Sequence, residues 1–298
     1  MPALENALQL SLKNILVTTD FSEFSGRAMS YAVALAHQYA ASVLVGHAIV
    51  PEPMPPVSVA IPADPVEESE RAELGMRQFL KTARVEDLAV KPIYARGHFE
   101  SVFANMVQEN DIDLVVVATH GRHGLKKFLF GSTAEEIYRT TSCPVLTIGP
   151  NVQPGVFTRQ PWQNVLWATD LSPRSAKTLE YAVALAQDHG AKLTAIHVIE
   201  DVYSVPMDYR EQALIEARRK LEAMLPPKGT LPFEPEVILR TGEVANAIAA
   251  AARENGADLI VMGARKQSSP WTAAHLPWAV AHQTICLAEC PVFNVSFE

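Results

Sequence analysis

The amino-acid sequence predicts an α/β protein built from two similar halves, each an open parallel sheet of five strands with helices on both faces. Two observations lead to this prediction. Short β-branched runs alternate along the chain with segments that carry apolar residues at helical spacing, which is the pattern of a parallel sheet covered on both faces. In addition, motifs of the first half return in the same order in the second half, which indicates a duplicated unit.

The repeat is clearest in two motifs. Residues 14–22 return as residues 164–172, and residues 31–36 return letter for letter as residues 181–186. A stretch rich in Gly and Pro, residues 149–155, interrupts both kinds of periodicity between the copies. We therefore expect two tandem domains, with the residue bounds 1–152 and 153–298.

Each half alternates strand and helix. In the first half, the pattern predicts strands at residues 15–18, 43–50, 90–95, 114–119 and 145–148. Helices are expected after a cap at Ser22 and at residues 66–84, 99–109 and 132–140. In the second half, Ser172 followed by Pro173 predicts a cap with proline at the first helical position. Open sheets of this kind bind ligands beyond the carboxyl ends of the strands, where the strand order reverses, so each half should hold one crevice near the ends of strands one and four.

Composition excludes several classes of protein. The net charge of −8 argues against a dedicated nucleic-acid binder, which needs a broad basic face. Apolar stretches such as residues 31–36 and 114–118 fall far short of the ~20 residues that span a bilayer, and the N-terminus lacks the pattern of a signal peptide. Three cysteines cannot form a disulfide framework. These features predict a cytoplasmic protein with no membrane or nucleic-acid partner.

The loop after the fourth strand carries the strongest chemical signal. Gly121, Gly124 and Gly131 flank a basic cluster, and Ser132 and Thr133 then open a helix. The cluster consists of Arg122, His123, Lys126 and Lys127. Glycines allow a ligand to approach the backbone, and a helix N-terminus offers free N–H groups. The loop therefore suits a polyphosphate; the alternative is a surface loop with solvated charges.

Together with residues 19–22 and His47, this loop resembles the universal stress protein family. The ATP-binding pattern of the family is Gly, two residues, Gly, nine residues, Gly, and then Ser or Thr. Here the four positions hold Ala118, Gly121, Gly131 and Ser132, so the spacing is complete and the first glycine alone departs. Since the resemblance spans both halves, it implies a tandem universal stress protein with Rossmann-like domains of the adenine nucleotide alpha hydrolase type.

The resemblance also implies the binding residues for ATP. Asp20 and the backbone near Thr18 would contact adenine and ribose, and the Ala48 backbone would pair with the adenine edge. The glycines and hydroxyls of the loop would bind the phosphates, which would hold Mg²⁺ or Mn²⁺ without a metal ligand from a protein side chain. The expected ATP-binding residues are Thr18, Thr19, Asp20, Ala48, Val117, Ala118, Gly121, Arg122, Gly131, Ser132 and Thr133.

Ala118 is the position at which this site departs from the family. Its methyl group would crowd the ribose or phosphate, and a positive φ at that position would cost about 1–2 kcal/mol. That cost corresponds to roughly tenfold in affinity.

The second half departs further from the ATP-binding pattern. Gly263 restores the first glycine, but Lys266, Leu276 and Pro277 occupy the positions of Gly121, Gly131 and Ser132. Losing two or three phosphate hydrogen bonds at ~1.5–3 kcal/mol each removes a large part of the roughly 8 kcal/mol that holds a micromolar ligand. We therefore expect no ATP in the second half, although Asp170 persists, and we expect Trp271 and Trp278 to fill the space.

Three functions follow from these observations. The favoured one is an ATP-binding stress-response protein that regulates a protein partner, with one working site and no catalytic residue. The alternatives are a slow ATPase or self-phosphorylating protein with Ser132 or Thr133 as the acceptor, and an interaction module with a vestigial site. The resemblance also implies that the fifth strands, residues 145–148 and 292–295, pair within the chain as a pseudo-dimer, and it leaves a homodimer open.

Other conspicuous side chains have structural interpretations. His47 and His197 recur at strand ends, where a satisfied structural hydrogen bond is the favoured role. Cys290 repeats Cys143 at the start of a strand and lies near Cys286, so a buried structural thiol is favoured over redox sensitivity.

Overall fold

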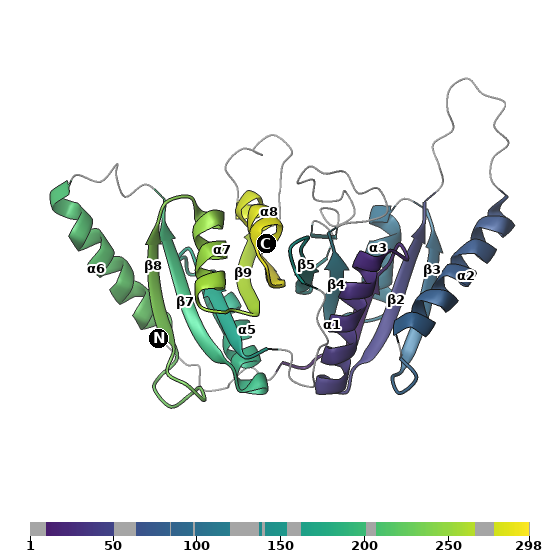
Figure 1. Ribbon diagram of the computed structural model, residues 1–298, viewed down its shortest axis with the longest axis horizontal. Coiled ribbons are helices and arrows are strands. Elements are labelled where there is room, and N and C mark those ends of the chain that lie inside the picture. The colour runs from purple at the N-terminus through teal and green to yellow at the C-terminus, as the bar shows by residue number, and fades with distance from the viewer. Residues whose placement is uncertain are drawn as a thin grey trace, which may run out of the picture. The chain divides into compact units, whose positions relative to one another are not determined.

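The computed structural model describes residues 10–50, 64–83, 85–97, 99–119, 137–138, 141–153, 162–200, 207–265 and 277–297 (Figure 1). The chain divides into two compact units. The N-terminal unit is Leu12–Cys143, and the C-terminal unit contains the chain from Pro144 onward. The short strand that ends the first repeat thus packs with the second repeat. The boundary of the sequence repeat at residues 152 and 153 remains a prediction.

The N-terminal unit is a parallel sheet with the strand order β3-β2-β1-β4. Its strands are β1 (Asn14–Thr18), β2 (Ser42–Ile49), β3 (Val90–Arg96) and β4 (Leu114–Ala118), and its helices are α1 (Glu23–Tyr39), α2 (Pro65–Ala83) and α3 (Phe99–Glu109). Right-handed crossovers place α1 and α2 on one face of the sheet and α3 on the other. The predicted bounds of these elements are confirmed to within one residue. Of the helix expected at 132–140, the structure describes residues 137 and 138, which are helical.

The C-terminal unit has the strand order β5-β10-β9-β6-β7-β8. Its strands are β5 (Val145–Ile148), β6 (Asn164–Ala168), β7 (Lys192–Ile199), β8 (Glu236–Thr241), β9 (Leu259–Arg265) and β10 (Val292–Phe297). Its helices are α5 (Ser175–His189), α6 (Met207–Met224), α7 (Val244–Glu254) and α8 (Pro277–Leu287). The α/β fold class is confirmed. One strand departs from the parallel arrangement, because β5 runs antiparallel to β10, with Phe293 opposite Leu146. The expected pairing of the two fifth strands is therefore confirmed.

The first helix of each repeat begins differently. Ser22 caps α1 as predicted, because its side chain accepts a hydrogen bond from Ser25 N. The same prediction for Ser172 is wrong: α5 begins at Ser175, and its N-cap, Arg174, makes no side-chain hydrogen bond. The chain after Pro173 forms tight turns instead, and the Ser172 carbonyl accepts from Ser175 N at 3.0 Å. Ser172 therefore contributes to this helix start through its carbonyl and through a long hydrogen bond of 3.4 Å between its Oγ and Ser175 Oγ.

An aspartate aligns the first and fourth strands in each repeat. The Asp113 carboxylate accepts from the amides of Lys13 and Asn14 at 2.7 and 2.9 Å. Asp258 holds the amides of Gln163 and Asn164 in the same way, at 2.7 and 3.1 Å. These bonds lie at the amino edge of each sheet and fix the two strands side by side. The carboxyl ends of the same strands therefore also lie together at the opposite edge.

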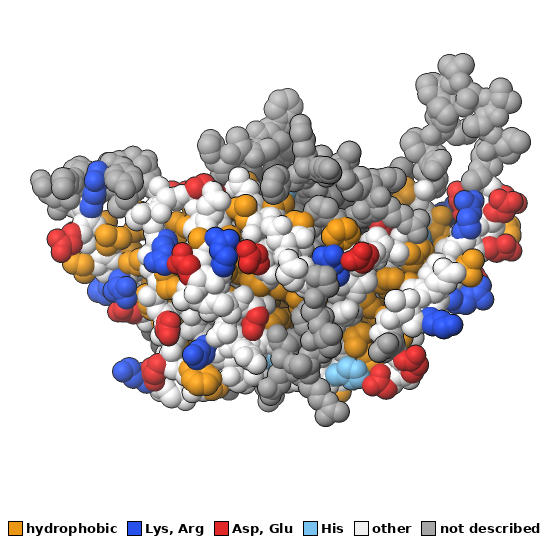
Figure 2. Space-filling view, in the orientation of Figure 1, with side chains coloured by type: hydrophobic (Ala, Val, Ile, Leu, Met, Phe, Trp, Pro, Cys, Tyr) orange, Lys and Arg blue, Asp and Glu red, His pale blue; other side chains and the backbone are white. Residues whose placement is uncertain are grey.

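Charges of both signs are intermixed on one face of the molecule. On the face shown in Figure 2, Lys and Arg side chains of the described residues lie beside Asp and Glu. Arg240 pairs with Glu254 at 2.8 Å and Arg253 with Glu289 at 3.3 Å. On this face, the described side chains form no broad basic patch of the kind that a nucleic-acid binder needs. Among the described helices, none is both long and apolar enough to cross a membrane.

The C-terminal unit buries a histidine that titrates far from its ordinary range. His189, at the end of α5, is 4% exposed, and its ring meets the buried Trp162 ring edge-on at 4.9 Å. Burial lowers the pKa of His189 to about 4, because a low-dielectric site disfavours the charged form. Below pH ~6.5 the unfolded chain binds a proton that the folded chain does not, so stability falls as the pH falls toward 4.

We expect His189→Phe to remove much of the acid sensitivity of the protein. The lowered pKa of His189 corresponds to a loss of about 3 kcal/mol in the free energy of unfolding between neutral pH and pH ~4. Urea unfolding at pH 7 and pH 4.5 measures this loss in the native protein and the variant. His37→Gln, at an exposed histidine, is the control and should leave the loss unchanged. An equal acid loss in His189→Phe and the native protein would contradict this explanation.

The two helix starts give a matched pair of variants. Ser22→Ala removes the side-chain cap of α1 and should lower the free energy of unfolding by about 1 kcal/mol. Ser172→Ala should cost clearly less, because α5 has no side-chain cap. Urea unfolding of both variants at pH 7 tests the difference, and equal losses would show that the assigned caps do not differ in strength.

Candidate functional site

The strand order of the N-terminal unit reverses between β1 and β4. From β1 the chain builds the sheet outward through β2 and β3, and it then returns to add β4 on the other side of β1. Val17 lies opposite Val116, so Thr18 and Thr19 follow directly beside Val117 and Ala118. Ligands of open α/β sheets bind at such a point. Five residues of the expected site thus come together at the end of these two strands: Thr18, Thr19, Asp20, Val117 and Ala118.

The turn after β1 is held by a dense set of hydrogen bonds. Buried Thr19 donates its amide to the Gly46 carbonyl of β2 at 2.9 Å. The half-buried carboxylate of Asp20 accepts at Oδ1 from Ser22 N at 3.0 Å and from Ser25 Oγ at 2.8 Å. Phe21 has a φ of 64°, which is the left-handed region and uncommon for a bulky residue. The turn therefore fixes the Asp20 carboxylate at the edge of the sheet.

His47 anchors the same turn from β2. Its Nδ1 lies 2.8 Å from the Thr19 carbonyl, and since a carbonyl only accepts, Nδ1 carries the proton. The Phe21 ring stacks on the imidazole with centroids 4.3 Å apart and also meets Phe79 of α2 at 6.2 Å. The predicted structural role of His47 is confirmed.

The position of the Phe21 ring explains why residue 75 is a glycine, which no sequence pattern indicated. A Cβ at Gly75 of α2 would lie 2.7 Å from the Phe21 ring, which is closer than real Cβ contacts. The glycine therefore makes room for the ring. No motif signals this contact, because the two residues belong to elements far apart in the sequence.

Ala48 presents its backbone toward the same space. In a parallel strand the N–H and C=O of one residue point to the same side. The Gly46 carbonyl faces β1, where it accepts from Thr19 N, whereas the Ile49 carbonyl faces β3, where it accepts from Gly97 N at 3.1 Å. Ala48 therefore faces the β1 side, at a level where β1 has already ended at Thr18. Its adjacent donor and acceptor can complement one edge of a heterocyclic base.

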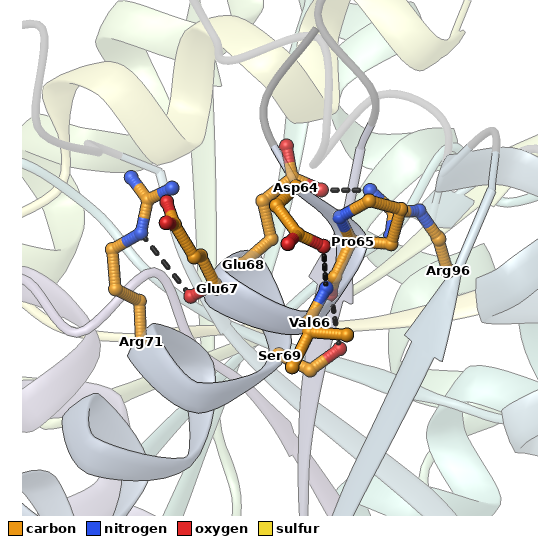
Figure 3. Close-up of polar contacts among 8 residues, drawn as sticks. All are labelled: Asp64, Pro65, Val66, Glu67, Glu68, Ser69, Arg71 and Arg96. Atoms are coloured by element: carbon orange, nitrogen blue, oxygen red, sulfur yellow. Dashed lines mark hydrogen bonds and ion pairs between the residues drawn. The ribbon is translucent and has the colours of Figure 1, made fainter.

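An ion pair between Glu68 and Arg96 lies at the end of β3 (Figure 3). Asp64 starts α2 by accepting from Val66 N at 2.9 Å, and Glu68 in the first turn pairs with Arg96 at the end of β3. The pair ties the carboxyl end of β3 to α2. At the equivalent position the second repeat has the uncharged Thr241, which lies opposite Ile199 as Arg96 lies opposite Ile49.

The phosphate-binding part of the expected site falls outside the described residues. It comprises Gly121, Arg122, Gly131, Ser132 and Thr133. At its start, β4 ends at Ala118 and is followed by the buried Thr119. Ala118 is not among the residues with positive φ. The backbone strain considered for Ala118 is therefore absent, and crowding by its methyl group remains the one effect to test.

The C-terminal unit repeats the turn almost bond for bond. Thr169 N donates to Ile196 O at 3.0 Å, and His197 Nδ1 lies 2.9 Å from Thr169 O. Asp170 Oδ1 accepts from Ser172 N at 2.9 Å and from Ser175 Oγ at 2.6 Å. The predicted structural hydrogen bond of His197 is thus confirmed, and the turn is common to both repeats.

The repeats differ at the end of the fourth strand. Where β4 ends at Ala118, the equivalent strand β9 continues through Gly263 to Arg265, in register with β10 up to Phe297. The backbone at this level is thus paired with β10. Lys266, Trp271 and Leu276 lie outside the described residues, as does the side chain of Trp278, whereas Pro277 begins α8.

Metal and redox chemistry find little support in the described part of the chain. It contains no group of three or more His, Cys, Asp or Glu side chains that could hold a metal ion. Burial, with the nearby Asp258 charge, raises the pKa of Cys290 to about 12, and burial raises the pKa of Cys286. Both thiols are therefore poor nucleophiles, as expected for structural cysteines.

Comparisons with known proteins agree with this architecture. The model of the universal stress protein family matches residues 11–149 and 161–296. Universal stress protein MJ0531 of Methanocaldococcus jannaschii is 25% identical over 142 residues, which are 46% of this chain and 81% of the relative. A universal stress protein of Mycolicibacterium smegmatis is 28% identical over 201 residues, 64% of this chain and 66% of the relative.

A solved structure matches nearly the whole length of the chain. A universal stress protein from Archaeoglobus fulgidus superimposes with a TM-score of 0.67 and 22% identity, covering 95% of this chain and 98% of that chain. This likeness supports the fold. Because the family model matches twice and covers most of the sequence, the chain belongs to the universal stress protein family and carries two copies of its domain.

Proposed function

We propose that this universal stress protein binds one ATP per chain, in the N-terminal repeat, and acts in the cytoplasm through nucleotide-dependent regulation of a protein partner. The carrying observation is the convergence, at the end of β1, of the Asp20 carboxylate, the backbone of Ala48 and the end of β4. This is the topological switch point at which open α/β sheets bind ligands. Family membership supports the role in stress response.

The adenosine end of the site follows from the geometry of β1 and β2. Ala48 offers an N–H and a C=O on the side that β1 has left, which matches the donor and acceptor pattern of the adenine edge. Asp20 is fixed next to this position by Ser22 N and Ser25 Oγ and can accept from ribose hydroxyls. Base and sugar would thus be held by backbone and carboxylate together.

The phosphate end follows from the sequence of the loop after β4. Gly121 and Gly131 let the backbone approach the phosphates, and Ser132 and Thr133 place hydroxyls and amides at a helix start. Arg122 adds a positive charge. Mg²⁺ or Mn²⁺ would be held mainly by the phosphate oxygens and would neutralise phosphate charge.

The restriction to one site rests on the second repeat. β9 keeps residues 263–265 in the sheet, paired with β10, and Pro277 replaces the serine that would donate its amide. Asp170 keeps its place in the turn, but Lys266 and Leu276 stand where the first repeat has Gly121 and Gly131. We therefore propose that this turn serves the fold in the C-terminal unit.

Titration calorimetry with ATP and Mg²⁺ tests the proposal, after co-purified nucleotide has been removed. We expect one site per chain with a dissociation constant in the micromolar range, and we expect Gly131→Val to abolish it. Ala118→Gly should change the affinity by less than about threefold, because Ala118 lies in regular strand without positive φ, so the left-handed strain is absent. Two equivalent sites would contradict the asymmetry, and no binding at millimolar ATP would contradict the function.

Asp20→Asn and Asp170→Asn form a matched pair for locating the site. An asparagine oxygen can still accept the two hydrogen bonds that hold each turn, so both variants should fold. Asp20→Asn removes the charge that would face the ribose and should weaken ATP binding about tenfold. Asp170→Asn should leave binding unchanged. Equal effects of the two variants would place ATP in both repeats or in neither turn.

A further inference from the structure

We propose that Ser25 is a positioning residue for Asp20 and that a relay of hydroxyls through Thr19 and Ser25 makes the site selective for nucleotides that keep their ribose hydroxyls. The inference rests on the proposed ATP site and adds to it a residue and a specificity. Ser25 lies in the first turn of α1 and is 4% exposed. Its hydroxyl is therefore largely shielded from solvent.

The relay runs through three consecutive hydrogen bonds. Phe21 N donates to Thr19 Oγ1 at 2.9 Å. Thr19 Oγ1 donates to Ser25 Oγ at 3.1 Å, and Ser25 Oγ donates to Asp20 Oδ1 at 2.8 Å. Ser22 Oγ also lies 3.2 Å from Ser25 Oγ, but along the relay itself each hydroxyl accepts one bond and donates the next, so its proton points toward the carboxylate. Bonds aligned in this way polarise one another.

The direction of the last bond follows from the competing acceptors. Ser25 Oγ also lies 3.0 Å from the Ser22 carbonyl, but this oxygen is neutral and farther away. A bond to an ionised carboxylate is shorter and stronger than one to a neutral group. The single hydroxyl proton of Ser25 therefore goes to Asp20. Together with Ser22 N, it fixes the orientation of the carboxylate plane.

The second repeat shows what the relay adds to the common turn. Ser175 donates to Asp170 and Leu171 N donates to Thr169 Oγ1 at 3.0 Å. In the described part of the second repeat, however, no hydrogen bond joins Thr169 to Ser175. Asp170 is also exposed where Asp20 is half-buried. The complete relay, with its protected carboxylate, belongs to the repeat for which we propose ATP binding.

An oriented carboxylate can discriminate between sugars. A carboxylate can accept about four hydrogen bonds, so Asp20 can serve the turn and a ribose together. Its orientation decides how well the ribose hydroxyls align, and hydrogen bonds weaken steeply with misalignment. Removing the Ser25 hydroxyl should therefore weaken ATP more than an analogue without ribose hydroxyls.

The experiment compares the affinities of ATP and 2′,3′-dideoxy-ATP by titration calorimetry with Mg²⁺. For the native protein we expect ATP to bind at least about tenfold more tightly, the value of one hydrogen bond to a charged acceptor. In Ser25→Ala and in Ser25→Cys, whose thiol is a weak donor, this ratio should fall to less than about threefold. Ser25→Thr keeps a hydroxyl and should restore the ratio.

Ser175→Ala is the matched control, because it removes the same donor from Asp170 and should leave the ratio unchanged. A general loss of structure would weaken both nucleotides equally and keep their ratio. ATP binding with the same ratio in the native protein and Ser25→Ala would overturn this inference and leave the proposed function intact. A native protein that binds neither nucleotide would overturn both, whereas a ratio near one in the native protein would overturn the selectivity alone.

Discussion

The hydrogen bond from Thr19 N to the Gly46 carbonyl is the contact on which the rest of the site depends. It is the last rung between β1 and β2, and beyond it the chain turns away through Phe21 in the left-handed region. Because β1 leaves at this point, the Ala48 backbone faces the space beyond its end, and Asp20 is held at the mouth of that space. In the second repeat, the equivalent hydrogen bond from Thr169 N to the Ile196 carbonyl is the last one between β6 and β7.

Both repeats keep this turn, so its first role is structural. Each copy has one residue in the left-handed region, Phe21 or Leu171. This conformation costs about 1–2 kcal/mol, which the surrounding hydrogen bonds must offset. His47 and His197 contribute by donating to the threonine carbonyls of the turns. Because a carboxylate can accept about four hydrogen bonds, one that closes a turn can also bind a ligand without a change of fold.

The sequence predicted regular elements well and long-range contacts poorly. The bounds of α3 and β5 agree with the structure residue for residue, because periodicity and β-branching are local properties. The roles of Ser22 and His47 were also predictable. The cap depends on residues next to Ser22 in the sequence, and His47 recurs as His197 at the end of the equivalent strand. The contact of Gly75 with Phe21 was not predictable, because it joins α2 to the turn after β1. Pro173 misled the prediction for Ser172, since the chain after it winds into tight turns before α5 begins.

Among the site residues, too, those indicated by local patterns were predictable and those that depend on long-range contacts were not. Asp20 and the end of β4 were placed together correctly, because the strand order follows from the alternation of strands and helices and from right-handed crossovers. Ser25 escaped notice, because a serine in the first turn of a helix is ordinary and its bond to Asp20 depends on the left-handed turn between them. The roles of Gly121, Gly131 and Ser132 remain predictions from the sequence pattern.

The second repeat, for which we propose no ATP site, has a structural role in the sheet. Its last strand, β10, pairs with β9 on one side and accepts β5 of the first repeat on the other. An unpaired edge there would expose a row of N–H and C=O groups to other chains. Leu146, Val292 and Phe293 at this seam are fully buried, so their apolar surfaces stabilise the pairing. The pairing of β5 with β10 depends on the shape and burial of the side chains in β10. A nucleotide site depends instead on the loop after the fourth strand. The loop sequence of the second repeat can therefore depart from the ATP-binding pattern while β10 still completes the sheet.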